Sequence, residues 1–126
     1  EFPRIDERRL GRRHRFGYMA LTGPEGNASG VPVWASVRKF DLERGTTETR
    51  HFGAGNGVGE PLFVPRNAAA AEDDGYVLVL NYNQARNASA FFVLDARNLT
   101  GEPLAEIRIP HRVPYGFHGN WVPAAS

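Results

Sequence analysis

Short apolar runs separated by clusters of glycine, proline and asparagine constrain the fold of this chain more than any other feature. The runs predict strands at residues 14–21, 31–42, 47–52, 60–66, 76–82, 88–95 and 103–110. In the first run Phe16, Tyr18 and Ala20 fall on one face, which is the alternation of a half-buried strand. Because no long segment keeps a 3.6-residue apolar period between helix caps, we expect an all-β fold.

The connections between these runs refine the expectation. Glu43-Arg44-Gly45-Thr46 predicts a turn that joins two runs into a β-hairpin. Residues 53–59 carry glycine at alternate positions and predict a turn; no Gly-Lys-Ser/Thr follows, so they are not a phosphate-binding loop. Residues 76–82 are the most apolar run and indicate a buried central strand.

A weak internal repeat groups the strands into modules. Phe40-Asp41-Leu42, followed by Gly45, resembles Leu94-Asp95-Ala96, followed by Gly101, and each precedes a strand of alternating polarity. Two hairpins of one type suit sheet modules that repeat around a propeller.

Composition excludes several classes of protein. The 126 residues fit one small domain, and a net charge of +1 gives no drive toward nucleic acid. Cysteine is absent, which excludes disulfides, thiolate nucleophiles and cysteine-based metal sites, and suits a cytoplasmic location. No apolar run approaches the roughly 18 residues that span a bilayer, and nothing resembles a signal peptide. Since the chain opens on Glu1 rather than Met, we expect it to be a piece of a longer protein.

Two surface features have an ordinary explanation beside a functional one. A basic cluster comprises Arg8, Arg9, Arg12, Arg13 and Arg15. It is either a patch for anions or membrane headgroups, or a solvated loop whose charges Asp6 and Glu7 partly match, and we favour the loop. The Asn-X-Ser/Thr sequons at Asn27, Asn87 and Asn98 are expected by chance in a turn-rich sequence without a secretory signal.

The closing stretch, residues 109–123, is the most suggestive place for chemistry. Its prolines stiffen the backbone, and Gly116 and Gly119 flank Phe117-His118 and permit a close approach. From the residues alone, His118 is either a ligand or catalytic group or a hydrogen-bonded structural histidine. His14 and His51 are predicted to face solvent. No His-x-x-x-His pair and no Gly-x-Ser-x-Gly elbow occurs.

Four segments, in this order, resemble the C-terminal part of the carotenoid cleavage oxygenases, the family that includes the lignostilbene dioxygenases. They are Glu1-Phe2-Pro3-Arg4-Ile5-Asp6, Gly59-Glu60-Pro61-Leu62-Phe63-Val64-Pro65-Arg66, Glu72-Asp73-Asp74-Gly75-Tyr76-Val77-Leu78 and Val113-Pro114-Tyr115-Gly116-Phe117-His118-Gly119. The resemblance covers essentially the whole chain. It implies the C-terminal blades of a seven-bladed β-propeller, with residues 1–126 a partial propeller within a single larger oxygenase domain.

The same resemblance implies a metal site. In the family a non-haem ferrous ion is held by four histidines, and three outer glutamates orient three of those imidazoles. His118 matches the last of the four ligands, and Glu60 and Glu1 match two of the orienting carboxylates. His14, His51 and His111 match no ligand, so the other ligands would lie upstream of Glu1. An imidazole bound through one nitrogen carries a proton on the other, which a carboxylate can accept as a hydrogen bond.

The implied activity is oxidative cleavage of an alkene C=C of a carotenoid, apocarotenoid or stilbene into two carbonyl products. The partners would be an apolar substrate, dioxygen and the upstream blades, with no nucleic acid; peripheral membrane contact would involve parts outside this chain. Phe63, Tyr115 and Phe117 either line a substrate tunnel or belong to an ordinary core. The alternative is a non-catalytic propeller fragment that acts as a binding or assembly module. The substrate, the bond and cleavage versus isomerisation stay open.

Overall fold

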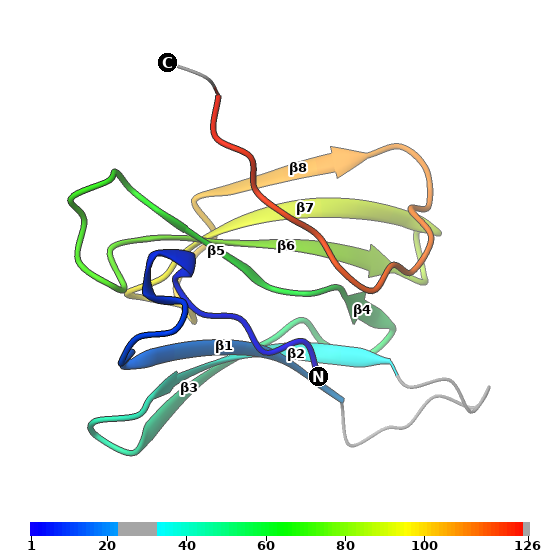
Figure 1. Cartoon of the computed structure of the whole chain (residues 1–126). Helices are drawn as coiled ribbons and strands as arrows, with labels where there is room; N and C mark the ends of the chain where they lie inside the picture. Colours follow the sequence, from blue (N-terminus) through cyan, green and yellow to red (C-terminus); the bar gives the residue numbers. More distant parts are fainter. Residues whose placement is uncertain (23–32, 125–126) are drawn as a thin grey trace.

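Two antiparallel β-sheets pack against each other in the computed structural model, which describes residues 1–22 and 33–124 (Figure 1). The first sheet contains β1 (Phe16–Thr22), β2 (Trp34–Asp41) and β3 (Thr46–His51). The second contains β4 (Asn56–Val58), β5 (Leu62–Pro65), β6 (Gly75–Asn83), β7 (Ala88–Asp95) and β8 (Ala105–Ile109). A short 3-10 helix, η1 (Glu7–Arg9), is the helical element of the described residues, so the all-β prediction is confirmed.

The first sheet has the order β1-β2-β3, and residues 1–4 extend it along the free edge of β1. Arg4 and Tyr18 exchange two backbone hydrogen bonds of 2.8 Å each. The alternation in β1 buries Phe16, Tyr18 and Ala20 on one face, as predicted. The predicted β2–β3 hairpin is confirmed, although the start of the expected strand 31–42 and the sequon at Asn27 lie outside the described residues.

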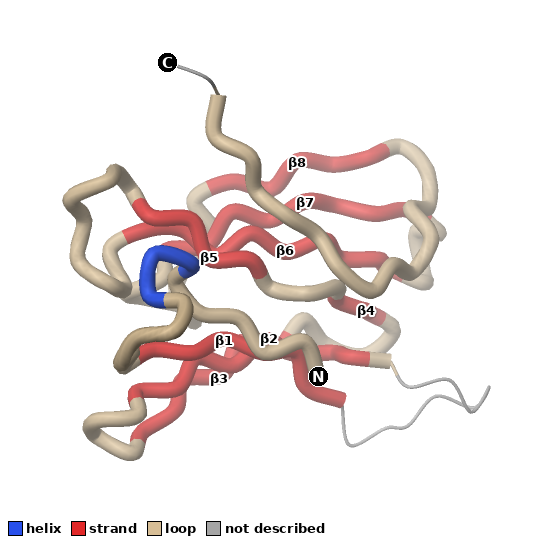
Figure 2. Tube along the Cα trace, in the orientation of Figure 1, coloured by secondary structure: helices blue, strands red, loops and turns tan. Residues whose placement is uncertain are grey.

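The second sheet is built around β6, which pairs with β7 on one side and with both β4 and β5 on the other (Figure 2). The prediction of a turn throughout residues 53–59 was wrong, because Asn56–Val58 form β4. The reason is the length of β6: β5 ends its pairing at Leu78, and the last residues of β6 need another partner.

The internal repeat is visible in the plan of the two sheets. Each sheet has an edge segment that we call its inner segment: residues 1–4 in the first sheet, and residues 60–65, which include β5, in the second. The inner segment pairs with β1 or β6, and that strand pairs with the hairpin β2–β3 or β7–β8. The aspartates of the two repeats each accept a hydrogen bond from a backbone amide in the turn that follows. Asp41 Oδ1 accepts from the Arg44 amide at 3.1 Å, and Asp95 Oδ1 accepts from the Arg97 amide at 2.8 Å. Both carboxylates therefore fix the start of the turn.

The hydrophobic core lies between the sheets. Its largest members are Phe2, Phe16, Tyr18, Val37, Val58, Phe63, Val77, Val79, Leu94 and Leu99. Tyr18 stacks on Phe63 with ring centroids 5.5 Å apart. Polar groups also cross the interface, since Lys39 Nζ donates to Asp73 Oδ2 at 3.0 Å and to the Ala96 carbonyl at 2.8 Å. Burial of each large apolar side chain contributes roughly 1.5–3 kcal/mol, so this interface is the main source of stability.

The basic cluster forms ion pairs at the surface. Arg8 pairs with Asp6 at 2.7 Å and Arg15 with Asp41 at 2.6 Å. Arg9 pairs with Glu72 and Arg13 with Glu43, so the charges of the loop are partly matched. The expected partner Asp6 is confirmed, whereas Glu7 was wrong, because it pairs with Arg4 outside the cluster. No helix within the described part of the chain is long and apolar enough to cross a membrane.

Candidate functional site

The C-terminal strap, which we define as residues 110–124, leaves β8 and runs back across the second sheet (Figure 1). Two hydrogen bonds with Ser89 of β7 fix its first part: the Ser89 amide donates to the His111 carbonyl at 3.1 Å, and the Val113 amide donates to the side-chain Oγ of Ser89 at 3.0 Å. This return brings the end of the chain to the segment between β4 and β5.

Aromatic contacts fix the middle of the strap. The Arg112 guanidinium lies 4.8 Å from the ring centroid of Tyr82 and 5.4 Å from that of Tyr115. The Tyr115 ring also covers Gly57 in β4: a Cβ placed there would lie 2.9 Å from Tyr115 Oη. Glycine at this position is what allows the strap to lie so close to the sheet.

The strap places His118 beside Glu60. Glu60 Oε1 lies 3.2 Å from His118 Nδ1, and Glu60 Oε2 accepts a 2.9 Å hydrogen bond from the Gly119 amide. The Glu60 side chain is only 5% exposed, whereas that of His118 is 74% exposed. The Phe2 ring stands edge-on to the imidazole at a centroid distance of 5.7 Å. A buried carboxylate thus holds an imidazole that is otherwise accessible.

This arrangement suits a metal ligand. A carboxylate beside Nδ1 favours the tautomer that carries its proton on Nδ1, which leaves the lone pair of Nε2 free to bind a metal ion. The donor chemistry therefore fits one imidazole ligand of a metal site. It does not make a whole site, since residues 1–22 and 33–124 contain no group of three or more histidine, cysteine or acidic side chains that could hold a metal.

Sequence reasoning identified Glu60 and His118 separately, and the structure pairs them. It missed two further contacts of Glu60. One is the Gly119 amide, and the other is Arg4, whose Nη1 lies 3.6 Å from Glu60 Oε1. Both residues stand in the segments that carry the family resemblance, so their positions in the sequence were a usable signal.

The remaining candidate residues lie elsewhere. Glu1 occupies the inner edge of the first sheet, where its nitrogen donates to the Ala20 carbonyl at 2.8 Å, and its side chain is exposed. Its orienting role stays a prediction. His51 is exposed, as predicted, and lies 2.8 Å from Ser36 Oγ, whereas His14 is half-buried. Phe63 belongs to the core, and Phe117 is exposed.

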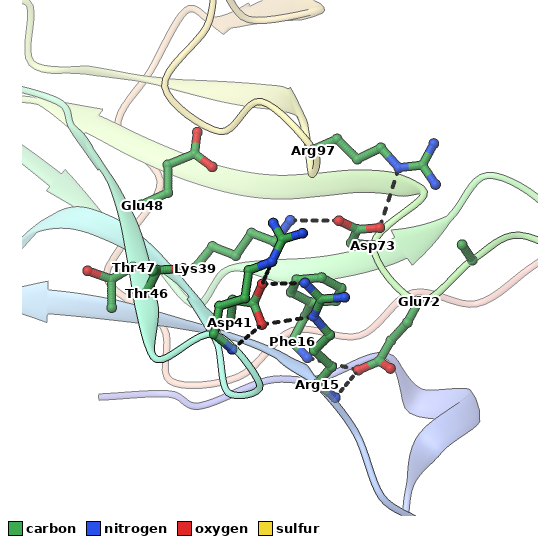
Figure 3. A pocket seen from close by; sticks show the side chains of 12 residues that line it. Arg15, Phe16, Lys39, Asp41, Thr46, Thr47, Glu48, Glu72, Asp73 and Arg97 are labelled. Carbon is green, nitrogen blue, oxygen red and sulfur yellow. Dashed lines mark hydrogen bonds and ion pairs between the residues drawn. The ribbon is translucent and has the colours of Figure 1, made fainter.

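A separate pocket of about 580 Å³ lies between the sheets, lined by charged residues that pair with one another (Figure 3). Arg15 pairs with Asp41, and Lys39 and Arg97 both contact Asp73. The Arg15 hydrogen bonds hold the pKa of the Asp41 carboxyl well below its usual range. Because its charges compensate each other and its lining includes neither Glu60 nor His118, we assign this pocket to the packing of the sheets.

Comparisons with known proteins find relatives along nearly the whole chain. The chain is 37% identical to the apocarotenoid-15,15'-oxygenase of a Synechocystis strain, over 96% of this chain and 24% of the relative. It is also 37% identical to lignostilbene-alpha,beta-dioxygenase isozyme III of Sphingomonas paucimobilis, over 100% of this chain and 27% of the relative. The lignostilbene dioxygenase of Pseudomonas brassicacearum superposes with a TM-score of 0.89 at 35% identity, over 98% of this chain and 27% of that one. The matching structures include a cobalt-substituted form of the Synechocystis enzyme.

The two sheets are therefore blades of a β-propeller of the class formed by these oxygenases, which confirms the predicted fold. The family described as retinal pigment epithelial membrane protein matches residues 1–123, and the chain belongs to this family, that of the carotenoid cleavage oxygenases. It spans about a quarter of the length of the relatives it matches.

Proposed function

We propose that the protein carrying this chain is a non-haem iron(II) dioxygenase that splits an alkene C=C of a carotenoid, apocarotenoid or stilbene into two carbonyl products. The supporting observation is the Glu60–His118 pair, in which a buried carboxylate aims an accessible imidazole. The named activities of the relatives, on apocarotenoids and lignostilbenes, support the same reaction class.

The residues of this chain contribute one ligand and its support. His118 would bind iron through Nε2, while Glu60 accepts the hydrogen bond from Nδ1 and the Gly119 amide holds the other carboxylate oxygen. Ferrous iron supplies the redox chemistry that activates dioxygen when it is bound. Further ligands would come from other blades, and Glu1 is proposed as a second orienting carboxylate.

The test uses the protein at the full length of its relatives. We expect His118→Ala to abolish both iron loading and carbonyl formation from a panel containing a carotenoid, an apocarotenoid and a stilbene. Glu60→Gln should lower activity or metal affinity by about 10- to 100-fold, because the amide holds the imidazole less well. Products would be followed by chromatography and iron by elemental analysis. If the His118→Ala protein cleaves the substrates at the wild-type rate, the proposal is contradicted. If the wild-type protein binds no metal, the alternative of a binding or assembly module is favoured.

Three further expectations belong to this proposal. Residues 1–126 would form the C-terminal part of a single larger oxygenase domain. The protein would be cytoplasmic, which fits the absence of cysteine. Any peripheral contact with a membrane would involve blades outside this chain.

A further inference from the structure

Arg4 connects the Glu60–His118 pair to the other β-sheet. It lies on the inner segment of the first sheet, fixed there by its two backbone hydrogen bonds with Tyr18. Its guanidinium contacts two carboxylates: Nη2 donates to Glu7 Oε1 at 2.8 Å, and Nη1 lies 3.6 Å from Glu60 Oε1. Glu60 precedes β5 in the second sheet, so this ion pair crosses the interface between the sheets.

The burial of Glu60 gives this ion pair its importance. A carboxylate that is 5% exposed is costly unless its charge is compensated. The Gly119 amide supplies a hydrogen bond but no net charge, and an imidazole that binds a metal ion does so in its neutral form. Among the described residues that contact Glu60, Arg4 carries the permanent positive charge, and its own side chain is only 20% exposed.

We propose that Arg4 is a positioning residue for the candidate metal ligand. It holds the Glu60 carboxylate close to His118 Nδ1. The orientation of the imidazole therefore depends on how the two sheets pack against each other. Two nitrogens of one planar guanidinium serve two different carboxylates, which the single ammonium of lysine cannot reproduce in the same geometry. The inference rests on the proposed function, since it concerns the same site.

The experiment uses cobalt(II) as the probe in the full-length protein. Its affinity is measured by competition with a chelator, and its visible absorption reports the geometry of the ligands independently of turnover. We expect Arg4→Gln to raise the cobalt dissociation constant by about 3- to 30-fold and to change the absorption spectrum, a weaker effect than that of losing Glu60 itself. Arg4→Lys keeps the positive charge but lacks the two guanidinium nitrogens that reach two carboxylates. Its cobalt affinity should fall between those of Arg4→Gln and the wild type.

Arg66→Gln is the matched control. Arg66 follows the other end of β5, pairs with Asp74 at 2.9 Å and is an exposed arginine whose partner is also a carboxylate. This variant should keep the affinity and the spectrum of the wild type. An Arg4→Gln protein that binds cobalt as Arg66→Gln does would overturn the proposal. If Arg4→Gln does not fold, Arg4→Lys is measured in its place. An Arg4→Lys protein with the cobalt affinity and absorption spectrum of the wild type would also overturn the proposal.

A double variant separates positioning from general stabilisation. If Arg4 acts through Glu60, adding Arg4→Gln to Glu60→Gln should weaken cobalt binding little further. If the fold-losses in cobalt affinity of the two single variants multiply in the double variant, the proposal is contradicted. His118→Ala distinguishes this inference from the proposed function. If His118→Ala binds cobalt normally, the metal site itself is wrong; if it loses cobalt while Arg4→Gln does not, only the role of Arg4 is wrong.

Discussion

At the scale of single residues, the position of the strap depends on the missing side chain at Gly57. An alanine Cβ there would lie 2.9 Å from Tyr115 Oη and 3.3 Å from Val33 Cγ1, so Gly57→Ala must displace the Tyr115 ring. Because Tyr115 is a half-exposed side chain that can move, we expect the free energy of unfolding to fall by about 1 kcal/mol, the lower end of the range for overpacking, measured by urea denaturation.

Gly116, on the strap itself, is the control for this change. A Cβ there would have nothing within 4 Å, and its φ lies outside the left-handed region. Gly116→Ala should therefore change the stability by no more than about 0.5 kcal/mol. Equal effects of the two substitutions would show that the strap does not depend on close contact at Gly57.

Asp41 predicts a pH dependence of stability. The hydrogen bonds from Arg15 lower the pKa of the Asp41 carboxyl in the folded protein. An acid whose pKa is lower when folded stabilises the fold above its ordinary pKa of about 4, and this stabilisation is lost as the pH falls through the folded pKa. Asp41→Asn keeps an oxygen for the turn but loses the charge. It should be less stable at pH 7 and lose less stability on acidification.

The measurement is the free energy of unfolding as a function of pH, with Arg15→Gln as the second arm. Since both single variants remove the same ion pair, each should lose less stability on acidification than the wild type. The double variant should differ little in stability from either single variant. If Asp41→Asn loses stability below about pH 4 as steeply as the wild type does, carboxylates other than Asp41 govern acid unfolding.

At the scale of elements, the sequence alternation predicted the strands well because the pattern is local. The face of β1 that carries Tyr18 and the turn after Asp41 both follow from residues close together in the chain. β4 was missed because glycine gives no apolar signal, and its pairing depends on the length of β6. The contact of Glu60 with His118, 58 residues apart, depends on how the strap folds back, which no local pattern encodes.

Lys39 tests how the two sheets are joined. Its ammonium is buried beside the Phe16 ring and donates to Asp73 and to the Ala96 carbonyl. Lys39→Met removes one partner of a buried charged contact and leaves the other polar groups unsatisfied. We expect a loss of about 1–3 kcal/mol in thermal or urea unfolding.

The neighbouring Arg38→Met is the control for Lys39→Met. Arg38 donates to Thr49 Oγ1 at 2.8 Å within the first sheet and does not join the sheets through that bond. Its substitution should cost no more than about 0.5 kcal/mol. If both variants lose the same stability, the polar contacts across the interface add nothing beyond those within a sheet.

At the scale of the whole molecule, the repeated plan of the sheets explains where the carboxylates stand. Glu1 and Glu60 each begin an inner segment, one beside β1 and the other leading into β5. A propeller brings the inner segments of its blades together around one axis. In the proposed site, equivalent positions on successive blades would face one axis, so orienting carboxylates far apart in the sequence would serve the ligands of one metal ion.

This reasoning predicts how the 126-residue chain behaves by itself. With His118 as the one imidazole aimed by a carboxylate among the described residues, the chain should bind cobalt(II) or iron(II) far more weakly than the full-length protein and should cleave no alkene. A single imidazole supplies one coordination bond, whereas stable sites in proteins combine several ligands held in place by their neighbours. Chelator competition on both proteins, with His118→Ala of each, measures the difference. The substitution should abolish tight binding in the full-length protein and change little in the chain alone. Tight, stoichiometric binding by the chain alone, lost on His118→Ala, would contradict this prediction and would require a site completed by a second copy of the chain.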